Sequence, residues 1–201
     1  MVVGWGLFVP AARPVPGNFV IDTERIRFLL FKIPDLSRDV PFALRSLFTA
    51  PWFNHDAVQL VYVTVLLVVF GVPFEARWGS ARLVGFFFGT AAAAAIVAGL
   101  LLHVIYPRIA ASPFFEHAWE RTWSGGSAGA FGVIGATAAR LERPWLLLGV
   151  AVAWEAFVVW WRLRGYTPAF HLSALAIGFL AARILLPARS DADRAGGALV
   201  S

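Results

Sequence analysis

The chain has 201 residues, of which 59% are hydrophobic and only 14% are charged, and its formal net charge is +5. A soluble domain carries about a quarter charged residues, so this composition indicates an integral membrane protein and excludes an ordinary soluble enzyme. A basic surplus on a membrane protein usually lies in cytoplasmic loops, so we expect a lipid bilayer around the chain and no nucleic acid partner.

Two stretches precede the first long apolar segment. Residues 1–12 are apolar but too short to span a bilayer, since a crossing needs ~20 residues, and we interpret them as the stub of a first helix. Residues 13–56 combine alternating charge with five prolines and short amphipathic pieces. We interpret them as an interfacial connector that places Trp52 and Phe53 at the level of the lipid headgroups.

Five apolar segments within residues 57–187 predict an all-α fold. They are Ala57–Phe74, Leu83–Pro107, Ser127–Ala139, Pro144–Trp161 and Pro168–Leu186. The predicted architecture is a polytopic membrane helix bundle with five clear spans and the stub of a sixth at the N-terminus. Residues 188–201 are expected to form a disordered cytoplasmic tail.

The arginines orient these segments. If the segment 57–74 runs inward, seven arginines collect on the cytoplasmic side and four lie in the short outer loops. This asymmetry places the C-terminus in the cytoplasm. Arginine far outnumbers lysine, which is typical of a GC-rich prokaryotic genome, so we expect a multi-pass protein of a prokaryotic cell membrane.

Two polar residues lie at one depth of the predicted bundle. Ser127 opens the third segment among glycines and alanines, where free backbone N–H groups can stabilise an anion. His171 lies three residues after Pro168, a position in the first turn of the fifth segment. These segments run in the same direction, so Ser127 and His171 could form a nucleophile and its general base. Alternatively, each is a packing residue that bonds within the bundle.

The motifs around these residues resemble those of the rhomboid family of intramembrane serine proteases. The family's nucleophile helix reads G-x-S-G-x-x-F/Y-G, and Gly125–Gly132 follows it except that Ala128 replaces the last glycine of G-x-S-G. Three further stretches are similar to family motifs: Leu47–Asp56 before the second family helix, Gly71–Arg82 after it (with Glu75, Arg77 and Gly79), and Ala169–Gly178 around the histidine. The resemblance extends from about Leu44 to Leu186.

The resemblance implies a catalytic dyad. Ser127 would attack a peptide carbonyl, His171 would take its proton, and Phe131 would pack on the histidine ring. A cofactor is not expected. A metal is not expected either, since the four histidines form no HxxxH pair and there are no cysteines.

The resemblance also implies an oxyanion hole, and here the sequence departs from the family. The family usually has a histidine and an asparagine on its second helix at the positions of Gln59 and Val63. The amide of Gln59 can still donate a hydrogen bond, whereas Val63 cannot. Gly125 and Gly126 would let the substrate backbone approach the serine.

Glu155 is a carboxylate inside the fourth segment. An ionisable group at membrane depth is a functional candidate, and Glu155 could orient or tune His171. The alternative is a hydrogen-bonded packing residue that faces the interior of the bundle.

The sequence therefore predicts an intramembrane serine endopeptidase that cleaves transmembrane segments of other membrane proteins. The alternative is a catalytically impaired rhomboid-like pseudoprotease that binds membrane clients, which the loss of a donor at Val63 would favour. A small transporter fits less well, because only Glu155 provides a buried charge near the midplane.

Overall fold

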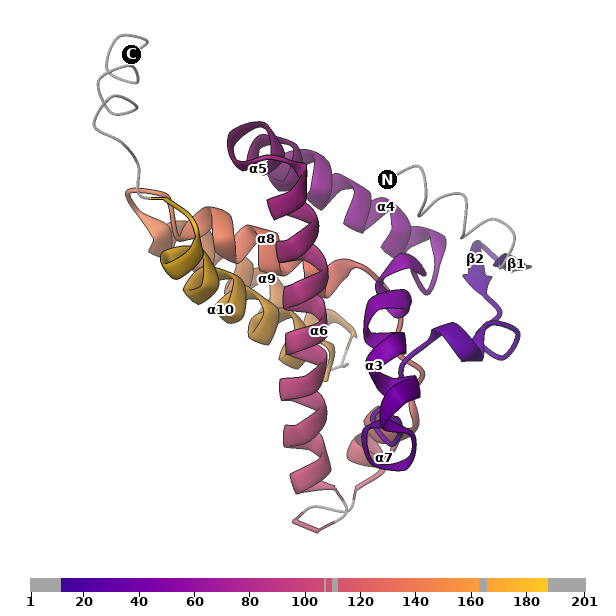
Figure 1. Ribbon diagram of the computed structural model, residues 1–201. Coiled ribbons are helices and arrows are strands. Elements are labelled where there is room, and N and C mark those ends of the chain that lie inside the picture. The colour runs from indigo at the N-terminus through magenta and orange to yellow at the C-terminus, as the bar shows by residue number, and fades with distance from the viewer. Residues whose placement is uncertain (1–11, 107, 110–111, 163–165, 188–201) are drawn as a thin grey trace, which may run out of the picture.

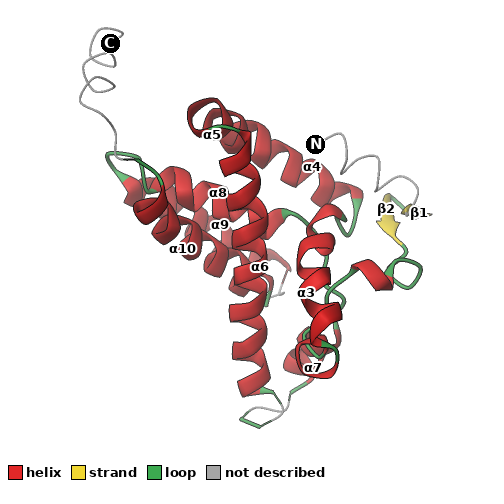
Figure 2. Ribbon diagram, viewed as in Figure 1, coloured by secondary structure: helices red, strands yellow, loops and turns green. Residues whose placement is uncertain are grey.

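The computed structural model describes residues 12–106, 108–109, 112–162 and 166–187 (Figure 1). The expected C-terminal tail lies outside these residues, as does the N-terminal stub except for Ala12, which begins a short hairpin of β1 (Ala12–Val15) and β2 (Asn18–Ile21). The rest of the described chain is mainly helical, which confirms the predicted fold class (Figure 2). The helical elements are η1 (Arg27–Leu29), α2 (Asp35–Arg38), α3 (Val40–Thr49), η2 (Ala50–Trp52), α4 (Ala57–Leu66), η3 (Leu67–Gly71), α5 (Val72–Trp78), α6 (Ser80–Ile105), α7 (Pro113–Glu120), α8 (Ser127–Ala138), α9 (Pro144–Arg162) and α10 (Thr167–Leu185).

Four helices in the described part of the chain are long and apolar enough to cross a membrane. They are Ala57–Trp78, Ser80–Ile105, Pro144–Trp161 and Thr167–Leu185. The first of them is α4 continued through the π-helical turn η3 into α5. Large apolar side chains on the outer faces of these helices are exposed, among them Val65, Leu101, Val150 and Ile184. Exposed apolar surface on this scale suits contact with lipid rather than water.

Helix α8 matches the predicted segment Ser127–Ala139 to within one residue and is too short to cross a bilayer alone. Its 12 residues give a length of about 18 Å, against about 30 Å of hydrocarbon in a bilayer. Ten of these residues are buried, so neighbouring helices rather than lipid surround α8. Because α8 is enclosed by protein, the non-helical chain before it can lie at membrane depth without exposing its backbone to lipid.

Glycines allow α8 to touch α10 and α6 through their backbones. A Cβ atom on Gly178 would lie 2.0 Å from the carbonyl oxygen of Gly132, and one on Gly135 would lie 2.0 Å from that of Leu175. A Cβ atom on Gly132 would overlap the hydroxyl of Thr90 on α6. Small residues permit this close approach in membrane helix pairs, and here they fix the parallel helices α8 and α10 against each other.

An arginine holds the ends of α8 and α10 at one level. Arg140, just after α8, donates through Nη2 to the carbonyl oxygen of Ala182 at 2.5 Å and to that of Leu186. Ala182 lies in the last turn of α10, where its carbonyl also accepts the N–H of the C-cap residue Leu186, so Arg140 caps the C-terminal end of this helix. With the far ends fixed in this way, the two helices also begin close together.

The connector before α4 packs against the bundle. In Figure 1, α6 runs between α3 on one side and α8 and α10 on the other. Leu30, Phe31 and Ile33 of the connector are buried in a cluster with residues of α3 and α6. The backbone of Phe31 also pairs with that of Trp123. The N to O distance is 2.7 Å where Trp123 donates and 3.4 Å where Phe31 donates. The connector therefore supports the loop that leads into α8.

Candidate active site

The loop before α8 is fixed by hydrogen bonds from the connector. The N–H of Gly125 donates to the carbonyl of Ala50 at 3.2 Å, and the N–H of Gly126 donates to Oδ1 of Asn54 at 3.3 Å. Asn54 is itself buried. Ser127 follows as the first residue of α8, so its position is set by the loop and by the helix together.

Ser127 and His171 lie within hydrogen-bonding distance of each other. Helix α10 begins at Thr167 with a proline in its first turn, which places His171 one turn into the helix. Nε2 of His171 lies 2.8 Å from Oγ of Ser127, and the two residues are only 7% and 6% exposed. The contact joins two parallel helices at one depth, as the sequence suggested.

The aromatic ring of Phe131 supports His171. Phe131 lies one turn after Ser127 on α8, and its ring stacks on the imidazole with a centroid distance of 4.5 Å and an interplanar angle of 13°. Phe131 is almost completely buried. This stacking restricts rotation of the imidazole and keeps its Nε2 directed at Ser127.

Glu155 lies on the other side of the same imidazole. Its Oε1 is 2.9 Å from Nδ1 of His171, and the residue is 2% exposed. A buried carboxylate is costly unless it is paired, and His171 on α10 is the partner of this carboxylate on α9. Among the residues that the structure describes, Oε2 of Glu155 has no hydrogen-bond partner. Ser127, His171 and Glu155 thus form a continuous hydrogen-bonded row.

Gln59 lies on the opposite side of Ser127. Its Oε1 accepts the N–H of His55 at 2.6 Å, which directs Nε2 toward Ser127 Oγ at 3.4 Å. The backbone N–H of Gln59 donates to Asp56, the N-cap of α4, at 2.7 Å. The start of α4 therefore holds the Gln59 amide beside the serine. Val63, one turn later, is buried and has no donor to offer.

Both glycines of the loop leave room for their neighbours. Gly125 has φ of +115°, a conformation that favours glycine, and a Cβ there would lie 2.4 Å from Nε2 of Gln59. A Cβ on Gly126 would lie 2.7 Å from the ring of Phe87. Side chains at these two positions would push Gln59 or the loop away from Ser127.

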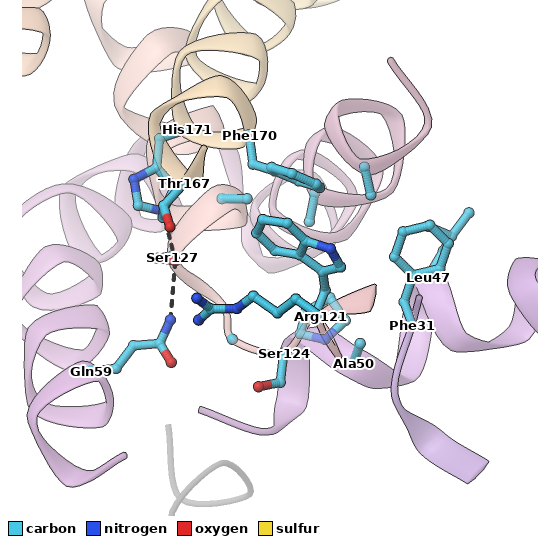
Figure 3. Close-up of a pocket in the computed structure, with 16 residues that line it drawn as sticks. Phe31, Leu47, Ala50, Gln59, Arg121, Ser124, Ser127, Thr167, Phe170 and His171 are labelled. Carbon is cyan, nitrogen blue, oxygen red and sulfur yellow. Dashed lines mark hydrogen bonds between the residues drawn. The ribbon is translucent and has the colours of Figure 1, made fainter. Parts of the chain in front are cut away.

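A cavity of about 460 Å³ adjoins the serine and lies between α4 and α9. Much of its lining is apolar and aromatic, with Tyr62, Trp154, Phe157 and Trp161 among the lining residues. A smaller pocket meets it at Ser127, His171 and Gln59 (Figure 3). An extended apolar peptide could therefore approach Ser127 from between two membrane helices.

Sequence reasoning missed two residues of this site. Asn54 lies in a motif that suggested the approach to a helix, but nothing in the sequence links it to Gly126. Arg121 counted only as a basic residue of an outer loop, whereas the structure places its side chain at both cavities. The available signal was the position of Arg121 in the sequence, shortly before Trp123 and the Ser124–Ser127 loop, which indicates that it lies close to the serine.

The described residues include no group of three or more His, Cys, Asp or Glu side chains that could hold a metal ion. The chemistry available at this site is that of a hydroxyl, an imidazole, a carboxylate and an amide. With the amide on one side of the hydroxyl and the imidazole and carboxylate on the other, these groups can perform acyl transfer.

Comparison with known families identifies a rhomboid domain over residues 41–188, well over half of the chain. The match begins in α3 and covers every helix of the bundle through α10. With the four long apolar helices, it identifies an integral, multi-pass membrane protein. A comparison with curated proteins finds no match.

Proposed function

The chain is a member of the rhomboid family, and we propose that it is an intramembrane serine endopeptidase that acts through a Ser127–His171 dyad. The observation that supports this proposal most is the buried 2.8 Å contact between Oγ of Ser127 and Nε2 of His171. A hydroxyl is a weak nucleophile unless an adjacent base removes its proton, and His171 is placed to do so.

The proposed reaction has two halves. Ser127 Oγ forms a bond to the carbonyl carbon of the scissile peptide while its proton moves to Nε2 of His171. Collapse of the tetrahedral intermediate breaks the C–N bond, and the imidazolium gives its proton to the leaving amine. Water then gives a proton to Nε2, attacks the acyl ester and releases Ser127 with its proton restored.

Two donors are available for the oxyanion. The first is the backbone N–H of Ser127, which lies at the start of α8, where the N–H groups have no acceptor within the helix. The second is Nε2 of Gln59, held near Ser127 by the bond from His55 to Oε1. One such donor contributes about a hundred- to a thousand-fold in rate. With Val63 unable to donate, the proposed enzyme is slower than one with a further side-chain donor.

Glu155 is proposed as a positioning residue. An ionised carboxylate only accepts, so its contact with Nδ1 places the proton of neutral His171 on Nδ1 and leaves Nε2 free to accept the proton of Ser127. The negative charge also stabilises the imidazolium that forms when Ser127 attacks. The hydrogen-bonded row would then operate as a serine–histidine–glutamate triad.

The proposed substrates are transmembrane segments of other membrane proteins. A helical segment shields its own peptide bonds, so a substrate needs small or helix-breaking residues at the cut. The aromatic cavity between α4 and α9 would receive such a locally unwound segment. We further propose a prokaryotic cell membrane and a cytoplasmic C-terminus, which would place the site near the outer surface.

The proposal is tested with the full chain reconstituted in lipid vesicles together with a fluorescent transmembrane peptide that contains a helix-breaking stretch. We expect cleavage by the native chain and none by Ser127→Ala or His171→Ala. Ser124→Ala is the matched control, since Ser124 belongs to the same loop (Figure 3), and it should still cleave. Cleavage that persists in Ser127→Ala would overturn the proposal.

A second function is favoured by one observation, the buried Val63 at a position that offers the oxyanion no donor. The chain would then be a pseudoprotease that binds membrane clients without cutting them. In the same vesicles this function predicts saturable binding of the peptide, equal for the native chain and Ser127→Ala, with no cleavage by either.

A further inference from the structure

A cation lies at the mouth of the proposed active site. Arg121 lines both the large cavity between α4 and α9 and the smaller pocket at Ser127. In Figure 3 its side chain extends into the pocket toward the Ser127–Gln59 pair. Of the described residues that line these two spaces, Arg121 is the only arginine or lysine.

The guanidinium of Arg121 is held in place by its neighbours. Nη1 donates to the hydroxyl of Tyr166 at 2.9 Å. The guanidinium also lies 5.4 Å from the ring centroids of both Trp123 and Tyr166, a cation–π arrangement. Trp123 in turn stacks on Phe170, the residue before His171, at 3.8 Å. The position of the charge is therefore coupled to the scaffold that carries the histidine.

Arg121 has unused capacity to bind an anion. A guanidinium has five N–H donors, and the bond to Tyr166 uses one of them. Within the described part of the chain, Arg121 forms no salt bridge. The two carboxylates at the large cavity have other partners: Glu155 contacts His171, and Asp56 accepts from the backbone of Gln59.

We propose that Arg121 selects substrates that carry an acidic side chain close to the scissile bond. This inference rests on the proposed protease function and specifies its substrate class. A carboxylate matches the fork of a guanidinium and can form two parallel hydrogen bonds with it. Aromatic walls around the cavity limit screening by water, so a carboxylate there interacts more strongly than at an exposed surface.

The test uses a set of transmembrane peptides that differ at one position, with aspartate or asparagine placed in turn at each of the three residues on either side of the cut. The full chain is reconstituted in vesicles of neutral phosphatidylcholine. At the favoured position we expect aspartate to raise kcat/KM by about tenfold over asparagine, the gain of one charge-assisted contact.

Variants at Arg121 report the origin of this preference. In Arg121→Gln the aspartate-to-asparagine ratio should fall to about one, and in Arg121→Glu a lysine at the same position should become the better substrate. Arg108→Gln, which removes an exposed arginine from a neighbouring loop, is the matched control and should keep the native ratio. A native chain indifferent to aspartate, or a ratio unchanged in Arg121→Gln, would overturn the inference.

A binding measurement separates this inference from the protease proposal. Affinities of the aspartate and asparagine peptides for Ser127→Ala, and for Ser127→Ala combined with Arg121→Gln, do not depend on cleavage. If this binding preference requires Arg121 while the native chain cuts none of the peptides, selection of an acidic side chain by Arg121 is upheld and the protease proposal fails. If Arg121→Gln instead leaves the aspartate preference unchanged and removes only an effect of phosphatidylglycerol added to the reconstituting vesicles, Arg121 binds lipid phosphate and the inference is wrong.

Discussion

Replacement of Glu155 with glutamine isolates the charge of the residue that contacts His171. Glutamine has the same shape, so the packing of a side chain that is 2% exposed is preserved. Its amide can meet Nδ1 of His171 in two ways, at the 2.9 Å now occupied by Oε1 of Glu155. The amide oxygen can accept from Nδ1–H, or the amide nitrogen can donate to Nδ1 and force the ring proton onto Nε2.

These two arrangements of the glutamine amide set the limits of the expected fall in acylation rate. In the first, a charge-assisted hydrogen bond becomes a neutral one, a loss of about 1.4 kcal/mol or about tenfold in rate. In the second, Nε2 can no longer accept the proton of Ser127, and a change of tautomer of this kind costs about ten-thousand-fold in serine proteases. We therefore expect the acylation rate of Glu155→Gln to fall by between about ten- and ten-thousand-fold.

The assay is the rate of covalent labelling by a fluorophosphonate at saturating concentration, which reports the reaction of Ser127 rather than binding. Glu116→Gln, a change at an exposed carboxylate of α7, is the matched control and should label at the native rate. Thermal unfolding of Glu155→Gln should match the native chain within a few degrees. Labelling within about threefold of native would show that Glu155 is a packing residue and refute the triad.

Three other substitutions test the supports of the site. Gly125→Ala should reduce labelling at least tenfold, because the φ of +115° is strained for alanine and the added Cβ would lie 2.4 Å from Nε2 of Gln59. Gly149→Ala is the control and should leave labelling unchanged, because the space around its Cβ is open. Gly178→Ala should lower the free energy of unfolding by about 1–3 kcal/mol, seen as a lower Tm, because its Cβ would lie 2.0 Å from a carbonyl oxygen of α8. Val63→Asn should raise labelling at least tenfold, toward the roughly hundred-fold of a well-placed oxyanion donor, whereas Val63→Leu should not. Equal rates for both would remove the proposed role of this position.

The sequence predicted the large features of the fold because each depends on local composition. Long uncharged segments specify membrane helices, and the observed bounds of α6 and α9 lie close to the predicted ones. The shared depth of Ser127 and His171 also follows from the sequence, since it needs only the order and direction of the segments. The helical fold class and the family were confirmed for these reasons.

Other features depend on contacts that no local pattern encodes. The enclosure of α8 by neighbouring helices, which bury ten of its residues, depends on how the bundle packs, whereas the sequence shows only a short run of small residues. The pairing of Glu155 with His171 requires the rotation of α9 about its own axis, which a uniformly apolar helix does not reveal. The bond from the N–H of Gly126 to Oδ1 of Asn54 joins positions 72 residues apart, and its donor is a backbone group that almost any residue could supply.

Activation of Ser127 is tested most directly by labelling the full chain, in detergent or vesicles, with a fluorophosphonate and identifying the modified residue by mass spectrometry. We predict a single adduct on Ser127 that disappears in Ser127→Ala and in His171→Ala and persists in Ser124→Ala. Folded native protein that remains unlabelled, or labelling that survives in His171→Ala, would contradict an activated Ser127 and favour the client-binding alternative.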